Sequence, residues 1–133
     1  MKIVVADRRG MVSSAVRSGF LQKRNPVLVV SANNCAKLEN YLYIQRPVVV
    51  ISGDLLQGFA THDHLGEFVK RANRWAVFVV YNSINDKTSR NVDFRIPRYT
   101  EMGAVTVGEY VADFLIANVL RGEDTTRQLD LDL

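Results

Sequence analysis

Short runs of β-branched and other apolar residues alternate along this chain with longer stretches in which apolar residues recur every three to four positions. The short runs are continuous, which is typical of strands buried on both faces of a sheet. They lie at Ile3–Ala6, Pro26–Val30, Val48–Ile51, Ala76–Tyr81 and, more weakly, Ala104–Val107. We therefore predict five strands.

The stretches between these runs have helical spacing, as where Val12, Val16 and Phe20 recur at every fourth position. The predicted helices cover Met11–Lys23, Cys35–Ile44, His64–Ala72 and Glu109–Leu120. Asn33 or Asn34 can cap the second helix. Strands that alternate with helices imply βαβ units with right-handed crossovers. The predicted fold class is α/β, a three-layer flavodoxin-like sandwich around a parallel sheet in the strand order 2-1-3-4-5.

Residues 82–103 depart from this alternation. A fourth crossover helix belongs here, yet Val92, Phe94 and Ile96 alternate with charged residues, which is strand-like spacing, and Pro97 would break a helix. We expect an extended loop or a short edge strand, helical only in part. Residues 1–120 then form one domain, and residues 121–133, polar and then acidic–apolar, are a frayed end or the start of a linker.

Composition narrows the function classes. The net charge of +3 is too small to argue for nucleic-acid binding, and the single Cys35 excludes an internal disulfide framework and a four-cysteine zinc site. The chain has no signal-peptide pattern and no apolar run near the roughly 18 residues that span a bilayer. A dinucleotide loop, a P-loop and a Ser/His/Asp triad are also lacking. We expect a cytoplasmic protein that is not an enzyme.

Two predicted strands end in an acidic residue. KIVVAD ends at Asp7 and PVVVISGD ends at Asp54. Ligand chemistry collects at the carboxyl ends of parallel strands, where two carboxylates can hold Mg²⁺ and one can attack a phosphoryl group. Arg8 follows Asp7 and Gly53 precedes Asp54, so the acidic pocket is incomplete.

These residues resemble a response-regulator receiver domain. MKIVVADRRGMVSSAVRSGF is similar to its opening strand and helix, PVVVISGDLL to its third strand, and MGAVTV to the turn into its fifth strand. The resemblance covers about residues 1–120. It implies a CheY-like fold and a role in two-component signal transduction or transcription regulation.

The correspondence of the site residues is partial. Asp7 matches the family's first acidic position, and Arg8 stands where the second, a metal ligand, is expected. The phosphoacceptor position falls on Gly53, with Asp54 one residue later, and neighbouring strand side chains point to opposite faces. We also expect Arg8 to pair with Asp7 or Asp54.

The remaining family positions are also altered. The hydroxyl at the end of the fourth strand matches Ser83, with Tyr81 and Asn82 as competitors, and the lysine after the fifth strand has no match. We therefore predict a pseudo-receiver, a regulatory module that works by protein–protein contact without ordinary phosphorylation and without a cofactor.

Two other functions stay open. One is a working receiver that takes phosphate onto Asp54, with Mg²⁺ held by Asp7 and Asp54. The other is a nucleotide- or nucleic-acid-binding domain that uses Arg8, Arg9 and the arginines of the segment Arg90–Arg98. Within residues 61–64, THDH, two histidines and an aspartate are metal-competent, but we favour a polar loop in which Asp63 caps the next helix.

The last predicted helix has two apolar stripes. Val111, Phe114, Leu115 and Val119 form the first, and Ala112, Ile116 and Leu120 form the second. A surface helix usually needs one stripe, so the second predicts an interface with a second copy of the chain or with a regulatory protein. Cover by residues 82–103 or by the tail is the alternative. A DNA-binding output domain would lie outside this chain.

Overall fold

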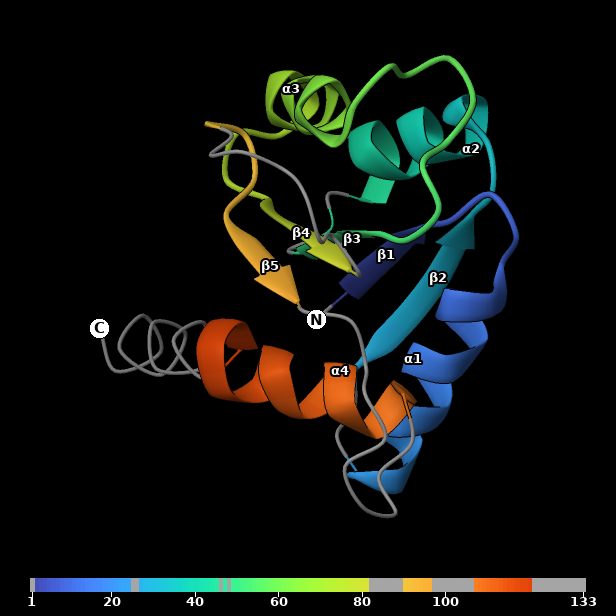
Figure 1. Cartoon of the computed structure of the whole chain (residues 1–133), viewed down its shortest axis with the longest axis vertical. Coiled ribbons are helices and arrows are strands. Elements are labelled where there is room, and N and C mark those ends of the chain that lie inside the picture. Colours follow the sequence, from blue (N-terminus) through green and yellow to red (C-terminus); the bar gives the residue numbers. More distant parts are fainter. Residues whose placement is uncertain are drawn as a thin grey trace.

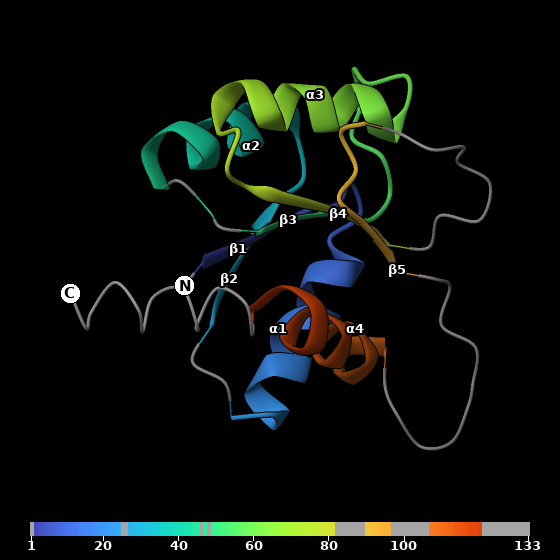
Figure 2. The ribbon, with the colours of Figure 1, turned by 90° about the vertical axis from the view of Figure 1, so that its left-hand side faces the viewer.

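The computed structural model of the chain describes residues 2–24, 27–45, 47, 49–81, 90–96 and 107–120. Five strands pair in parallel in the order β2-β1-β3-β4-β5, and helices cover both faces of the sheet (Figures 1 and 2). The strands are β1 (Lys2–Ala6), β2 (Leu28–Ala32), β3 (Val49–Ser52), β4 (Val77–Tyr81) and β5 (Phe94–Ile96). The predicted three-layer fold and its strand order are confirmed.

Four α-helices connect or follow these strands. They are α1 (Met11–Gln22), α2 (Cys35–Asn40), α3 (His62–Ala72) and α4 (Val107–Leu115). Two π-helical turns, η1 (Tyr41–Gln45) and η2 (Ile116–Leu120), extend α2 and α4. Within the described ranges no helix is long and apolar enough to cross a bilayer.

Side-chain caps mark the starts of α2 and α3. Asn34, one of the two predicted candidates, accepts the N–H of Lys37 at 2.8 Å. The prediction that Asp63 caps the third helix was wrong, because Thr61 adopts the extended conformation of a cap and accepts the N–H of His64 at 3.1 Å. Asp63 lies in the first turn, where a negative charge favours the helix dipole.

The fifth strand lies in a different segment from the run predicted at Ala104–Val107. Val107 begins α4, and residues 104–106 lie outside the described ranges. The short edge strand expected within residues 82–103 is confirmed at Phe94–Ile96. Asp93 fixes its start, since its N–H donates to the Phe78 carbonyl at 2.9 Å and its carboxylate accepts the Phe78 N–H at 2.8 Å. Pairing to β4, rather than local hydrophobicity, selects this segment.

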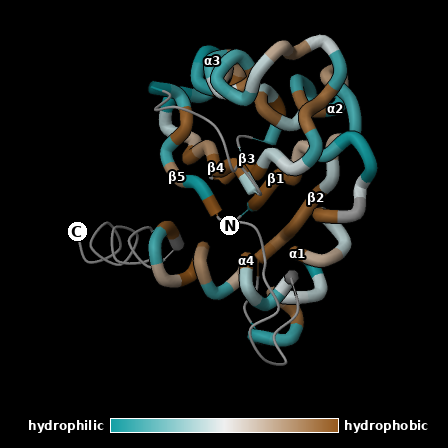
Figure 3. The backbone as a smooth tube through the Cα atoms, in the orientation of Figure 1, coloured by the Kyte–Doolittle hydropathy of each residue, from teal (hydrophilic) through white to brown (hydrophobic). Residues whose placement is uncertain are grey.

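The core has two halves, one on each face of the sheet. Ile3 and Val5 point into the half covered by α1 and α4, and Val4 and Ala6 point into the half covered by α2 and α3. Figure 3 shows the hydrophobic strands at the centre and alternating hydrophilic and hydrophobic residues along α3. Strands buried on both faces explain why their sequence runs are continuous.

Helices α1 and α4 approach each other at two glycines. A Cβ atom on Gly19 would lie 2.1 Å from the Gly108 carbonyl oxygen, and one on Gly108 would lie 1.8 Å from the Ala15 carbonyl oxygen. Ala112 lies in the same core and is fully buried. Its assignment to an interface stripe was therefore wrong, because its side chain is buried in the half of the core that α1 and α4 cover. Ile116 is partly buried against the same core, and the side chain of Leu120 lies outside the description.

Candidate functional site

The carboxyl ends of β1 and β3 meet as the sequence predicts. Ala6 pairs with Ser52 in the parallel register, so Asp7 and Gly53 are the next residues on neighbouring strands. The N–H of Gly53 donates to the Ala6 carbonyl at 3.0 Å, and the N–H of Arg8 donates to the Asp54 carbonyl at 3.3 Å. These bonds continue the pairing of the two chains beyond the strands and hold the two loop starts together.

Asp7 is buried at this junction, with 1% of its surface exposed. Its Oδ2 atom accepts the N–H of Val12 at 2.9 Å, and its Oδ1 atom accepts the N–H of Asp54 at 3.1 Å. Gly10 makes the first contact possible, because its left-handed backbone, with φ of 74°, turns the chain into α1. Both carboxylate oxygens of Asp7 are thus engaged in joining the start of α1 to the end of β3.

Gly53 and Asp54 point in different directions. A Cβ atom on Gly53 would lie 3.1 Å from the Asp7 Cγ atom and 3.0 Å from a methyl carbon of Val12. A side chain at position 53 would therefore begin in direct contact with the Asp7 carboxylate. The Asp54 side chain is 50% exposed and pairs with Arg9, with 3.2 Å between Oδ2 and Nε.

The prediction that Arg8 pairs with Asp7 or Asp54 was wrong. Arg8 is exposed and forms no ion pair with any residue in the described ranges, whereas the next residue, Arg9, pairs with Asp54. The Arg9 side chain is 67% exposed, so this pair is solvated and contributes roughly 0–1 kcal/mol. The turn after Asp7, rather than adjacency in the sequence, decides which arginine reaches the carboxylate.

A pocket of about 200 Å³ opens at these strand ends. Its lining residues are Val12, Gly53, Asp54, Leu55, His62 and Tyr81. His62 enters it from the start of α3, and its Nδ1 atom lies 3.0 Å from the hydroxyl oxygen of the buried Ser52. The sequence analysis left His62 in a polar loop. The available signal was Ser52, a polar residue ending a buried strand and so in need of a hydrogen-bond partner.

The hydroxyl expected at the end of β4 has one described candidate. Tyr81 ends that strand and lines the pocket, whereas Ser83 and Asn82 lie outside the described residues. The two histidines of THDH diverge, since His64 packs edge-to-face against Phe59 at 5.3 Å between ring centroids. No group of three His, Cys, Asp or Glu residues in the described ranges is placed to hold a metal ion.

Cys35 and the described arginines of the segment Arg90–Arg98 lie away from this pocket. Cys35 is a free, half-buried thiol at the start of α2. Arg90 is exposed and Arg95 is partly buried in β5, while Arg98 lies outside the described residues. The described residues therefore bring together Asp7, Gly53 and Asp54 but assemble no continuous arginine surface.

We compared the chain and its fold with known proteins. No family model and no curated protein matches the chain. A response regulator receiver domain protein from Bacillus halodurans C-125 is similar in structure, with a TM-score of 0.60 and 10% identity over 86% of this chain and 95% of its own. The chain has the fold of a response-regulator receiver domain.

A second receiver-fold match comes from RcsB of Salmonella enterica serovar Typhimurium, in a structure bound to the promoter rprA in the presence of the phosphomimetic BeF3−. It has a TM-score of 0.61 and 18% identity, and covers 100% of this chain and 77% of that protein. Identities this low establish the fold alone. Within that fold, Gly53, the residue that the resemblance aligns with the phosphoacceptor, lines the strand-end pocket and lies next to Asp7.

Proposed function

We propose that this chain is a receiver-like regulatory module that acts through protein–protein contact and without phosphorylation of an aspartate. The observation that carries the proposal is position 53, which lines the strand-end pocket beside the Asp7 carboxylate but has no side chain. The neighbouring Asp54 is half exposed and paired with Arg9. A nucleophilic carboxylate is thus absent from the position that the receiver fold would use.

The chemistry of the pocket supports the same proposal. Transfer of a phosphoryl group to a carboxylate requires a cation that neutralises the developing charge. Asp7 has one main-chain N–H on each oxygen, and Arg8 occupies the position of the second acidic residue. Each Asp7 oxygen keeps one lone pair for a cation, but with Arg8 at the neighbouring position Asp7 would have to hold Mg²⁺ without a second carboxylate there.

The proposed partners are a second copy of the chain or another regulatory protein in the cytoplasm. A role in transcription would require an output domain outside this chain. Since Ala112 is buried, Ile116 is the one residue of the predicted homodimer stripe whose described side chain retains some exposure. The homodimer therefore stays a prediction that sedimentation must test.

The decisive experiment exposes the chain to Mg²⁺ with beryllofluoride, and separately to Mg²⁺ with a small-molecule phosphodonor. We expect no shift of the backbone NMR signals of Asp7, Gly53 and Asp54, and no phosphoryl adduct by intact-protein mass spectrometry. Saturable binding or an adduct that disappears in Asp54→Asn would overturn the proposal and establish a working receiver.

A rebuilt pocket provides the positive control. Arg8→Asp combined with Gly53→Asp restores the missing carboxylates, at the cost of a small displacement of Val12, whose methyl carbon lies 3.0 Å from the new Cβ position. We expect this variant to gain Mg²⁺ binding in calorimetric titration. The matched pair Arg8→Asn with Gly53→Asn has nearly the same shape without the charge and should not gain it.

A further inference from the structure

A second pocket lies at the opposite end of the sheet, at the amino ends of the strands, where the helices end. It has a volume of about 360 Å³, with Leu42 and Tyr43 of η1 on one side and Lys70, Arg71, Arg74 and Trp75 from the end of α3 on the other. We call it the η1–α3 groove. The η1 wall is apolar and aromatic, the α3 wall combines three cations with Trp75, and none of the described lining residues is acidic.

The groove exposes large apolar side chains. Trp75 is 79% exposed and Tyr43 is 61% exposed, and the neighbouring Ile44 is 72% exposed. In the part of the chain that the structure describes, five large hydrophobic residues are exposed, and these three lie in or beside the groove. An apolar patch rimmed by polar residues is typical of an interaction site.

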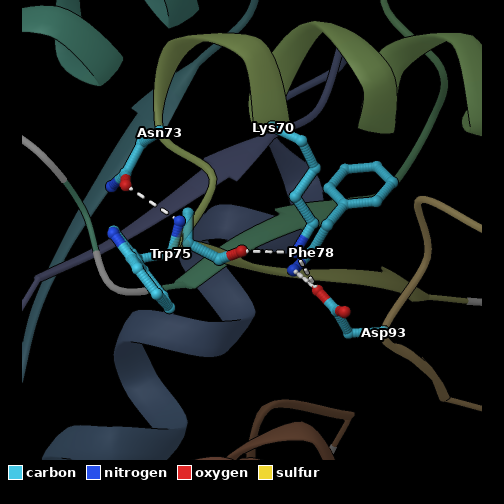
Figure 4. Close-up of polar contacts among 6 residues, drawn as sticks. Lys70, Asn73, Trp75, Phe78 and Asp93 are labelled. Carbon is cyan, nitrogen blue, oxygen red and sulfur yellow. Dashed lines mark hydrogen bonds and ion pairs between the residues drawn. The ribbon is translucent and has the colours of Figure 1, made fainter.

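The three basic side chains of the groove differ in the contacts that they already make. Lys70 donates to the Ala76 carbonyl at 2.6 Å and pairs with Asp93, as Figure 4 shows beside Trp75. Arg71 pairs with Glu67 while its side chain stays 78% exposed. Arg74 is exposed and places its guanidinium 4.8 Å from the centre of the Trp75 ring. Arg71 and Arg74 can therefore meet an incoming carboxylate without losing a buried contact.

The chain itself contains a segment of complementary composition. Residues 128–133 read QLDLDL, in which leucine alternates with aspartate. An extended segment of this pattern presents leucines on one side and carboxylates on the other. Leucines would pack on the exposed rings of Tyr43 and Trp75, and carboxylates would meet the cations of the α3 wall.

The segment is also within reach of the groove. Figure 2 shows that α2, α3 and α4 all end at the same edge of the sheet, with α4 on the opposite face from the groove. Residues 121–127, which separate η2 from this segment, can span at most roughly 25 Å when extended. Packed elements lie about 8–10 Å apart, so passing from the α4 layer to the α3 layer requires roughly 20 Å.

We infer that the η1–α3 groove is the docking site of the chain's own acidic–apolar segment, residues 128–133. Leu129 and Leu131 cover Trp75 and Tyr43, and Asp130 and Asp132 meet Arg71 and Arg74. This inference is independent of the phosphorylation state proposed for the opposite edge.

Trp75, the only tryptophan in the chain, reports on this contact directly. In the full-length chain, Asp130→Lys with Asp132→Lys should shift the Trp75 emission to longer wavelength and raise its quenching by acrylamide. Glu123→Lys with Asp124→Lys makes the same charge change in the same tail and should leave both unchanged. Arg74→Glu should mimic the first variant, and combining the two should add no further change to the quenching.

A peptide of residues 121–133 added to the Asp130→Lys/Asp132→Lys chain tests the site in trans. A short tether gives an effective concentration on the order of 1 mM, so a segment docked about 90% of the time predicts a peptide Kd of about 0.1 mM. Arg74→Glu should weaken peptide binding by up to about fivefold, as expected for exposed charge pairs. Equal Trp75 quenching in the wild type and the lysine variant, or no saturable response to the peptide, overturns the inference. Protection of Trp75 that rises with protein concentration overturns it in favour of docking between two copies.

Discussion

Replacing Asp7 by Asn should destabilise the fold for a reason unrelated to metal or phosphate. Asp7 is buried, and each of its carboxylate oxygens accepts a main-chain N–H, from Val12 at 2.9 Å and from Asp54 at 3.1 Å. An amide keeps one acceptor and turns its NH₂ group toward the other N–H. The variant therefore loses one hydrogen bond to a charged group, which costs about 1.5–3 kcal/mol.

Two further substitutions calibrate this magnitude. Asp7→Ala removes both acceptors and should cost about 3–6 kcal/mol by the same reasoning. Asp54→Asn disrupts only a half-exposed pair with Arg9 and should cost roughly 0–1 kcal/mol. The two aspartates thus differ sharply in structural role, although they looked equivalent as acidic strand ends.

Urea denaturation followed by far-ultraviolet circular dichroism measures these costs, with and without millimolar Mg²⁺. We expect a lower midpoint for Asp7→Asn at an unchanged m-value, and no effect of Mg²⁺ on either protein. For a chain of this length the loss corresponds to a Tm lowered by roughly 5–15 °C. A wild-type midpoint for Asp7→Asn would refute the reasoning, since the two main-chain contacts would then contribute nothing. Stabilisation of the wild type by Mg²⁺ that is lost in Asp7→Asn would show a cation site instead.

Gly108→Ala should destabilise the chain by about 1–3 kcal/mol in thermal unfolding, because the new Cβ atom would lie 1.8 Å from the Ala15 carbonyl oxygen. Helix propensity alone favours alanine, so an unchanged or raised Tm would contradict the close crossing of α1 and α4. Ile116→Asp should lower the stability of the fold, because Ile116 packs against the core. A fully stable variant whose sedimentation mass is half that of the wild type would instead establish the dimer stripe.

The sequence by itself determined the alternation of strands and helices. Burial on both faces demands continuous apolar runs, as in β1 and β3, and burial of one helix face demands a recurrence every three to four residues, as at Val16 and Phe20. The cap at Asn34 was also predictable, because its contact with Lys37 spans three residues. Such features depend on neighbours along the chain, which the sequence displays directly.

Tertiary structure decided the features that depend on distant neighbours. Edge pairing with β4 placed β5 at Phe94–Ile96, and the close crossing of α1 and α4 buried Ala112. The turn after β1 brought Arg9, not Arg8, to Asp54. In each case several positions were equally compatible with the local pattern. The choice among them depends on which backbone segments pack side by side, and hydrophobic periodicity does not encode that relation.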